Sequence, residues 1–421
     1  MTKLIIVLII LLGIIAIAQL MRVLELSAQL RNKREEDISA GDTKLNANLM
    51  ILFMVSLYVS FIYLLAKYGN GGLPVAASAQ GAETDWLLNI NFYLIIVVFF
   101  ITNTLLFVFA SKYAFNKERK AFFYPHNNKL ELLWTVVPAA VLAVIIILGL
   151  KTWNNITTFD DSEGERVKIE LYSKQFEWIA RYSGEDNLLG RSDFRLVTGE
   201  NPLGVQTTAS IDATIAGMEK MIVDLDSLYA KSGRPSNPSE VMTEAARAKT
   251  RAKKERMQRH LKKVIALRTT MSPEIDQQAA DDRVIKLKEI HLVVNKDYEF
   301  LFRSQDVIHS AYMPHFRSQM NTVPGMVTRL KLRPTITTDS MRTITGDDKF
   351  DYILLCNKIC GAAHNNMWMK IVVEKEEEYK KWYKEQLPFA GVAAKPEDAI
   401  VPTNDSTSTD STATPSVVAQ N

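Results

Sequence analysis

Four apolar runs without a charged residue mark the first 150 positions of the chain. Each run has 17 to 19 residues, close to the roughly 20 that span a bilayer as a helix. A buried core helix usually has a shorter apolar run, so we predict four membrane-spanning helices. The runs are Leu4–Leu20, Leu49–Ala66, Phe92–Ala110 and Leu132–Leu150.

The loops between these runs differ in charge, which predicts the orientation of the helices. Loops 22–48 and 112–130 each hold five Lys or Arg residues, whereas loop 69–85 holds none. Positively charged loops stay on the cytoplasmic side. We therefore expect both termini, and everything after Lys151, on the outer side of a bacterial-type inner (cytoplasmic) membrane that the chain crosses several times.

Two groups of small residues resemble signal-peptidase sites, Ala16–Ala18 and Ala77–Ala79. Cleavage at the first would put the basic loop 22–48 outside, against the charge rule. Cleavage at the second would leave a two-span chain with the same topology. We expect all four spans to be retained.

After residue 165 the pattern changes to short stretches that mix β-branched and aromatic residues with polar ones. Several short stretches of this kind predict a β-sandwich or barrel. We expect strands in 166–182, a pair in 283–303 that is broken at 295–297, and further strands at Met326–Leu332, Tyr352–Leu355 and Lys370–Val373.

Residues 193–281 have a different character and predict a helical insertion in the β-rich domain. Ser236–Ser239 is typical of a helix start, and Glu240–Arg268 is rich in Ala, Lys, Arg, Met and Leu. This second stretch holds ten Lys or Arg residues against three Glu residues. Such a charge pattern indicates a solvated face, or a contact with a partner subunit or with anionic lipid headgroups.

Composition excludes several classes of protein. Lys and Arg total 50 and Asp and Glu total 47, and a net charge of only +3 argues against a nucleic-acid binder. Two cysteines are too few for a disulfide-rich scaffold, and no C-x-x-C-H motif is present for covalent haem attachment.

Both cysteines lie in the segment Cys356–Met367, which places two thiols, the imidazole of His364 and a thioether within twelve residues. Thiolate and thioether ligands favour copper. A zinc site of Cys₂His₂ type, with His309 as the distant ligand, is an alternative. A Cys356–Cys360 disulfide is another, but it would leave His364 and Met367 without a role.

Four stretches carry motifs in the order E-x-x-W-T-x-x-P, Q-x-x-W, D-V-x-H-S and C-x₃-C-x₃-H-x₂-M. They are His126–Pro138, Gln175–Trp178, Asp306–Gly325 and Cys356–Met367. In this order they resemble subunit II of the haem–copper cytochrome c oxidases, over roughly residues 90–190 and 283–385. The resemblance implies a cupredoxin-like domain with a dinuclear copper centre, CuA, that holds two copper ions per chain.

The resemblance also implies a function in the respiratory chain. The protein would be the electron-accepting subunit of a proton-pumping terminal oxidase, a cytochrome c oxidase with oxidoreductase and translocase activity. It would take electrons from a cytochrome c, or from a quinol-oxidising complex carrying a cytochrome c domain. It would pass them to haem in subunit I, where oxygen is reduced to water, and the chain itself would have no oxygen-reducing site. Its partners would be subunit I, other oxidase subunits and membrane lipids, with no nucleic acid.

The resemblance implies six copper ligands. Two thiolates bridge the metals, each of two imidazoles holds one metal, and a thioether and a backbone carbonyl are the weak axial ligands. In that order they are Cys356 and Cys360, His309 and His364, Met367, and Lys358.

Three further positions matter for the implied mechanism. Phe176 and Trp178 match the positions where electrons arrive, although Phe176 stands where the family usually has Trp, which questions the usual docking route. Glu131 resembles the acid at the mouth of a proton pathway, but a carboxylate that stabilises a helix start is an alternative. Lys358 replaces a Glu that often binds magnesium, which argues against a magnesium site. His291 and His315 match no motif, so we expect structural roles for them.

The predicted architecture is therefore membrane helices followed by an all-β, cupredoxin-like sandwich. We divide the chain into 1–68, two N-terminal helices outside the family core; 86–151, the helix pair of the subunit II type; 165–385, the outer copper domain with its insertion at about 193–281; and 388–421, a disordered polar tail. One rival function is a membrane-anchored copper chaperone of thioredoxin-like type, which predicts a βαβ pattern and no Met ligand. A structural zinc protein is a second.

Overall fold

The structure is a computed structural model that describes residues 2–30, 39–116, 118–120, 122–159, 166–233, 242–285 and 288–389. The chain divides into two compact units. One contains Met1–Val75 and Thr84–Lys151, and the other contains Ala76–Glu83 and the chain from Thr152 onward. Residues 390–421 of the predicted tail and the helix start at Ser236–Ser239 lie outside the described residues. At the start of the predicted tail, Phe389 is 5% exposed and donates its amide to the Asp282 carbonyl at 2.7 Å, so this residue is packed and not disordered.

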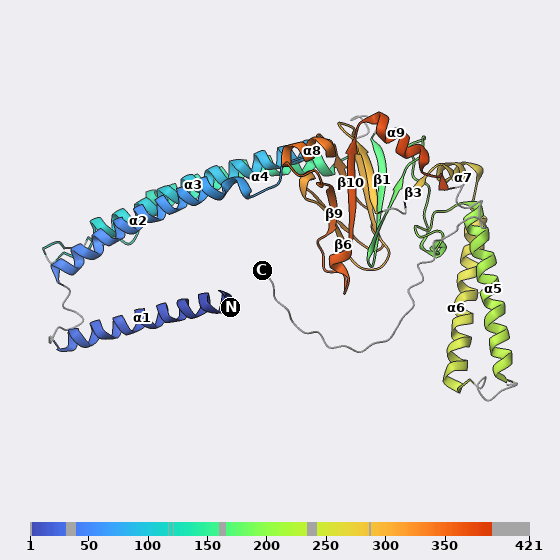
Figure 1. Cartoon of the computed structure of the whole chain (residues 1–421), viewed down its shortest axis with the longest axis horizontal. Coiled ribbons are helices and arrows are strands. Elements are labelled where there is room, and N and C mark those ends of the chain that lie inside the picture. Colours follow the sequence, from blue (N-terminus) through green and yellow to red (C-terminus); the bar gives the residue numbers. More distant parts are fainter. Residues whose placement is uncertain are drawn as a thin grey trace. The chain divides into compact units, whose positions relative to one another are not determined.

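Four long helices contain the four predicted apolar runs (Figure 1). Three of them, α2, α3 and α4, are long and apolar enough to cross a membrane, and none buries its most apolar window within the structure. The first helix, α1, forms as expected, and its role as a fourth span stays a prediction. The bounds are α1 Thr2–Leu30, α2 Ala40–Tyr68, α3 Ala79–Lys112 and α4 Asn128–Thr157.

The second unit contains a sandwich of two five-stranded sheets, in the orders β3-β2-β1-β5-β8 and β4-β10-β9-β6-β7. Neighbouring strands are antiparallel except β1 with β5 and β10 with β4. The strands are β1 Val167–Lys174, β2 Glu177–Tyr182, β3 Arg283–Ile285, β4 Glu289–Val293, β5 Tyr298–Ser304, β6 His309–Met313, β7 Ser318–Thr322, β8 Thr328–Leu332, β9 Tyr352–Cys356 and β10 Trp368–Glu374. This confirms the predicted β-sandwich and differs from the βαβ pattern that a thioredoxin-like chaperone predicts.

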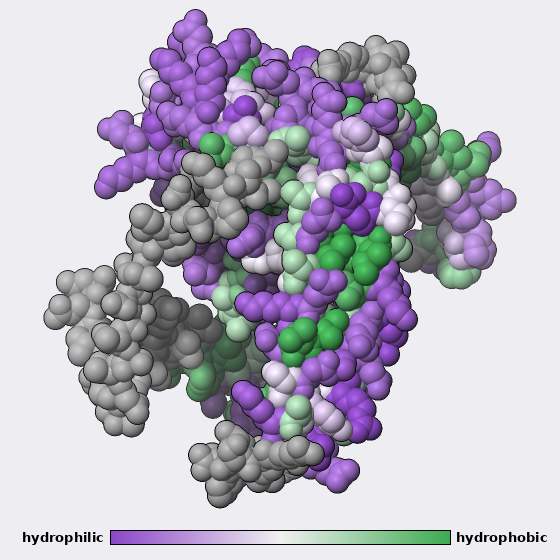
Figure 2. Space-filling model, turned by 90° about the vertical axis from the view of Figure 1, so that its right-hand side faces the viewer, coloured by the Kyte–Doolittle hydropathy of each residue, from purple (hydrophilic) through white to green (hydrophobic). Residues whose placement is uncertain are grey.

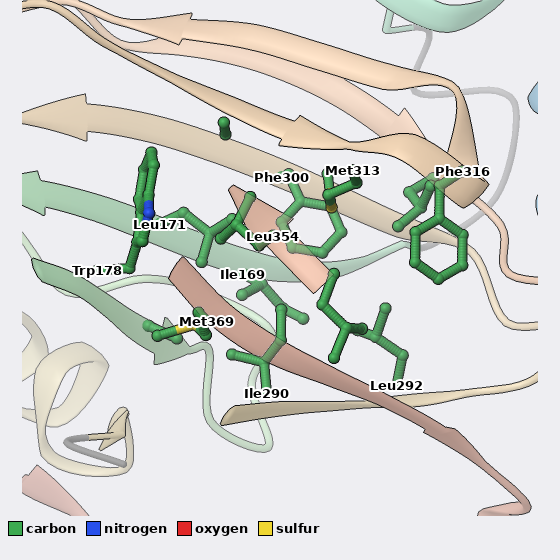
Figure 3. Packing of buried hydrophobic residues seen from close by; sticks show 14 of the residues in the cluster. Ile169, Leu171, Trp178, Ile290, Leu292, Phe300, Met313, Phe316, Leu354 and Met369 are labelled. Carbon is green, nitrogen blue, oxygen red and sulfur yellow. The ribbon is translucent and has the colours of Figure 1, made fainter. Parts of the chain in front are cut away.

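Apolar side chains from the two sheets meet in one core. Ile169 and Leu171 of β1 and Phe300 of β5 point toward Leu354 of β9 and Met369 of β10 (Figure 3). All five are fully buried. The alternating buried and partly buried positions of β9 and β10 reflect one face on this core and one toward the outside.

The β3-β2-β1-β5-β8 sheet is covered on its outer face as well. Tyr172 and Ile179 pack there against Leu203, Val205 and Ala279, which belong to the base of the insertion. This cover explains why five consecutive residues of β1 are buried. It also explains why apolar and polar residues alternate only roughly in this strand.

The insertion contains α5 (Thr208–Gly233), α6 (Glu244–Arg268) and α7 (Pro273–Ala280). The helices α5 and α6 form a hairpin that is rooted beside α7 (Figure 1). The sequence predicted helix from Glu240, but α6 begins at Glu244, because the side chain of Thr243 accepts a hydrogen bond from the Ala246 amide and caps it.

Several other elements differ from the prediction. Residues 166–182 form two strands that turn at Gln175–Phe176, and residues 283–303 hold three strands instead of two. The prediction also did not set α5 apart within the helical insertion, and it missed β6, β7 and the short helices α8 (Thr338–Thr345) and α9 (Glu376–Glu385). β6 and β7 were missed because their sequences, HSAYM and SQMNT, contain no Val, Ile or Phe, residues that favour strands, although they lie beside β9 and β8.

The segment Ala76–Glu83 packs into the sandwich unit although most of α3 does not. Ala77 is fully buried, donates its amide to the His315 carbonyl at 2.7 Å and accepts the Thr335 amide at 2.8 Å. The Ser78 hydroxyl donates to the Phe316 carbonyl at 2.7 Å. The second cleavage-like site of the sequence is thus an integral part of this unit's packing.

Candidate metal centre

The predicted ligands come together at one end of the β4-β10-β9-β6-β7 sheet. Cys356 ends β9, and the loop that follows returns at Trp368, where β10 begins. His309 begins β6, which pairs with β9 through Ala311 and Cys356. The pairing of β6 with β9 therefore brings the distant histidine beside the first cysteine.

Short distances link the donor atoms of this site. The two Sγ atoms of Cys356 and Cys360 lie 3.9 Å apart, and both cysteines are free thiols, so they do not form the alternative disulfide. His309 Nδ1 lies 3.9 Å from the sulfur of Cys356, and His364 Nδ1 lies 3.5 Å from the sulfur of Cys360. The sulfur of Met367 lies 3.9 Å from that of Cys360.

The sixth predicted donor, the carbonyl oxygen of Lys358, lies 3.2 Å from the sulfur of Cys356. Ligand atoms of His309, Cys356 and Cys360 all lie within 4.8 Å of one another. His364 approaches the group from the side of Cys360. All six predicted ligands are thus in one cluster, with one imidazole beside each cysteine.

The cluster is shielded from solvent. Cys356 is 8% exposed, Cys360 5% and Met367 2%, and His309 is fully buried. Burial, together with the nearby Cys356 sulfur, raises the pKa of the Cys360 thiol to about 11. A bound cation reverses this effect because it stabilises the thiolate, which is the form that ligates metals. The residues therefore fit a soft metal ion, with thiolate, imidazole and thioether donors converging; the two sulfurs of the cysteines, His309 and Met367 are buried and His364 is partly exposed.

Asp306 orients the His309 ring. The Nε2–H group of His309 donates to Asp306 Oδ1 at 2.9 Å, which leaves Nδ1 free to face the cysteines. A carboxylate behind a histidine in this way fixes its tautomer and direction as a metal ligand. Burial acts to raise the pKa of Asp306, but hydrogen bonds from His309 and from the amides of Gln175 and Val307 outweigh it and lower that pKa.

The turn between β1 and β2 braces the other side of the metal loop. Gln175 donates its amide to Asp306 Oδ2 at 2.7 Å and its side chain to the Cys360 carbonyl. Gly361 has φ +140°, and a Cβ there would lie 2.9 Å from the Phe176 ring. Only glycine lets the backbone approach the ring this closely. Gln175 and Asp306 belong to sequence motifs, but nothing in those motifs predicts that they brace the ligands.

The two predicted electron-accepting residues both lie beside the cluster. Phe176 is partly buried against the core and adjoins Gly361. Trp178 is 3% exposed, donates Nε1–H to the Met367 carbonyl at 3.4 Å and lies edge-on to His309 with the ring centres 6.3 Å apart. Phe176 is thus the more accessible of the two.

The remaining predictions concern residues away from the cluster. Glu131 accepts the Asn127 amide at 3.2 Å at the start of α4, which is the contact that the helix-start alternative requires.

His291 bonds to Glu374 at 2.8 Å and stacks on Trp382. His315 packs edge-on against aromatic rings, and burial, aided by Arg317, lowers its pKa. Both histidines have packed, structural surroundings, as expected.

The chain combines helices able to span a membrane with a cupredoxin-like sandwich that carries a sulfur-rich cluster. This combination is typical of membrane-anchored redox proteins. Two family models match the chain: the transmembrane domain of cytochrome c oxidase subunit II over residues 66–152, and its periplasmic domain over residues 256–376. The chain belongs to the cytochrome c oxidase subunit II family. It is therefore a membrane protein with an outer, cupredoxin-like domain that works with other oxidase subunits.

Curated relatives agree with this family. The chain is 28% identical over 313 residues to "Alternative cytochrome c oxidase subunit 2" of Bradyrhizobium diazoefficiens, which covers 74% of this chain and 83% of that protein. It is 20% identical over 323 residues to cytochrome c oxidase subunit 2 of Cereibacter sphaeroides, covering 75% and 79%. The crystal structure of the periplasmic domain of subunit II of the cytochrome oxidase of Bradyrhizobium japonicum matches at 15% identity and a TM-score of 0.24, over 52% of this chain and 91% of that one.

Proposed function

We propose that this chain is the electron-accepting subunit of a proton-pumping terminal oxidase. A cytochrome c-type donor on the outer side of a bacterial inner membrane gives it electrons, and it passes them to haem in subunit I, where oxygen is reduced to water. The observation that carries the proposal is the assembly of six donor groups around two buried cysteines.

The cluster would hold two copper ions. Cys356 and Cys360 would supply its thiolate ligands, and one imidazole adjoins each sulfur. When bound, such a pair of metals exchanges a single electron. The chain's own residues keep the ligands in place during that exchange: Asp306 holds His309, and the Gln175 side chain holds the loop at Cys360. A rigid set of ligands moves little between redox states.

The rim of the cluster supports docking to another subunit. Ile359 lies between the two cysteines in sequence and is 87% exposed. An exposed apolar side chain at the tip of a ligand loop suits a contact with the haem-bearing subunit. Lys358 is also exposed, and its positive charge argues against a magnesium ion bound beside it.

Metal analysis and spectroscopy of the purified oxidase test this function. We expect two copper ions per chain and the purple, near-infrared-absorbing spectrum of a mixed-valence pair. Zinc in place of copper, or a single copper per chain, would overturn the dinuclear assignment. Unlike a copper chaperone, the complex should also accept electrons from reduced cytochrome c and consume oxygen.

A matched pair of variants tests the proposed proton pathway at Glu131. Glu131→Gln keeps an oxygen that can accept the Asn127 amide but cannot carry a proton. We expect turnover to fall by about a hundredfold, the lower end of typical contributions of acid–base residues, while reduction of the copper site by the donor stays fast. Glu131→Ala also loses the helix-start contact and serves as comparison. If Gln restores full turnover and Ala does not, Glu131 only stabilises the start of α4.

A further inference from the structure

The helix α6 carries far more positive charge than its surroundings neutralise. It has ten Lys or Arg residues, and its only acidic residues are Glu244 and Glu255. Four of the cations are used inside the hairpin. They are Arg247 and Arg251, which lie over the Tyr229 ring, and Lys254 and Arg268, which pair with Asp226 and Asp212.

Four other cations form a continuous row, which we call the basic stripe: Lys249, Lys253, Arg256 and Lys263. The spacing i, i+4, i+7, i+14 puts them on one face of the helix, and His260 occupies the i+11 position. The stripe is about 21 Å long at 1.5 Å per residue. All of these side chains are exposed, and none forms an ion pair within the described residues.

The stripe lies beside the packed face of α6. The buried residues Thr250 and Val264 each follow a stripe lysine by one position, which places them about 100° around the helix from Lys249 and Lys263. The side of the molecule that includes the hairpin is mainly hydrophilic (Figure 2). Like charges at this spacing destabilise an isolated helix, so an opposing set of carboxylates would relieve the repulsion and gain charge-assisted hydrogen bonds.

A protein suits this surface better than a lipid bilayer. Helices that lie on a membrane usually insert Trp, Phe or Leu beside their cations, whereas α6 has no Trp, Tyr or Phe and its two leucines, Leu261 and Leu267, are partly buried within the structure. Within this unit, Ala77–Ala79 pairs with residues 333–335 just before α8, and the hairpin is rooted at the other side of the sandwich, beside α7 (Figure 1). The hairpin and this segment are therefore attached at different sides of the same unit.

We propose that the basic stripe is a docking surface for an acidic face of a partner protein that associates with the oxidase on the outer side of the membrane. The proposal goes beyond the proposed function, because the stripe lies on a helix outside the copper ligands and can fail without affecting them.

Carbodiimide cross-linking of the whole oxidase, isolated from its own membranes at low salt, tests the contact. The reagent joins a lysine amine to a carboxylate as an amide, with loss of the activated oxygen as urea. We expect mass spectrometry to find Lys249, Lys253 or Lys263 joined to an Asp or Glu of another polypeptide. Cross-links at other lysines of the chain but none from the stripe to a second polypeptide would overturn the proposal.

Two charge-matched variants sharpen the test. The variant K249Q/R256Q/K263Q removes three charges from the stripe, and K220Q/K231Q/K262Q removes three exposed charges elsewhere on the hairpin. We expect the cross-linked partner to dissociate from the stripe variant at a lower salt concentration than from wild type or control, with the copper spectrum unchanged in all three. Equal salt dependence in all three would overturn the proposal. So would a stripe variant whose only defect is weaker binding to phosphatidylglycerol vesicles, because the stripe would then bind lipid.

Discussion

The metal loop 356–367 and the α5–α6 hairpin are both additions to the same sandwich, but they are held in opposite ways. The loop is fixed by the sandwich around it: the Cys356 amide donates to the Met367 carbonyl at 3.1 Å, and the Asn357 amide donates to the Ser310 carbonyl at 3.2 Å. The hairpin is fixed mainly by its own two helices, and α6 buries only Thr250 and Val264. The metal loop, which needs precise geometry, is thus held by contacts with several strands. The exposed hairpin is held mainly by the packing of α5 against α6.

Breaking the metal loop should have the largest effect. Cys356→Ser removes one of the two sulfurs that lie 3.9 Å apart, and a hydroxyl is a poor ligand for a soft metal. We expect loss of the dinuclear spectrum and of cytochrome c oxidation. The hairpin should be intact, which unchanged hydrogen exchange in α6 would verify. Retention of two copper ions in shared valence would contradict the bridging role.

Core substitutions in the two regions should separate their stabilities. Leu171→Ala in the sandwich core should cost about 2–5 kcal/mol of unfolding free energy, because the packed sheets cannot close around the cavity. Val264→Ala removes a fully buried side chain from the hairpin base and should cost about 1–2 kcal/mol.

Hydrogen exchange and the copper spectrum distinguish these two variants. For Val264→Ala we expect faster exchange in α6 with an unchanged spectrum, and for Leu171→Ala faster exchange throughout the strands. A perturbed copper spectrum in Val264→Ala would show that the two regions are coupled after all.

The same contrast explains what the sequence could predict. That the donor residues would cluster was predictable because they are concentrated in twelve residues and in one motif around His309. The membrane helices were predictable because a long apolar run has few alternatives. By contrast, α5 was not set apart within the predicted helical insertion, because its sequence mixes Asp, Glu and Lys with apolar residues and its cap, Thr207, is one of several Thr and Ser residues there.

Contacts between segments that are distant in the sequence also could not be predicted. Nothing local indicates that Gln175 braces Cys360, or that Ala77 pairs with His315 and Thr335, because these segments meet only through the sheet topology. Strand β1 is buried on both faces only because the base of the insertion covers its outer face. A charged residue in a strand, such as Glu170, reads as solvent-facing until that cover is known.

The joint between the sandwich and the insertion should respond to pH. Arg181 of β2 bonds to Glu170 at 2.7 Å and to Asp282, after α7, at 3.0 Å. Burial raises the pKa of Asp282 to about 7, although Arg181 and the Gly190 amide oppose this. Because the folded state then holds a proton that the unfolded state releases, this group's stabilisation is present below about pH 4 and is lost as the pH rises toward 7.

Asp282→Asn should remove this pH dependence, which amounts to about 1.4 kcal/mol per pH unit at most. Relative to wild type, the Asn variant should gain stability between pH 4 and pH 7 in denaturant unfolding of the full chain. Asp339→Asn is the control, since that side chain is 84% exposed. If the free energy of unfolding rises over this range by the same amount in wild type and in both variants, Asp282 stays ionised beside Arg181.

The smallest effect is expected at Met367. A variant there separates the contribution of the thioether from that of the loop that holds the other ligands. Met367→Leu keeps the volume of a buried side chain and removes only the sulfur that lies 3.9 Å from Cys360. A thioether at an axial position tunes a copper site more than it holds the metal. We expect both copper ions to remain, with a shifted reduction potential and a slightly altered near-infrared band. Trp178 should keep its bond to the Met367 carbonyl, because the backbone does not change. Loss of copper from this variant would mean that the thioether holds the metal, and that the braced loop alone is not sufficient.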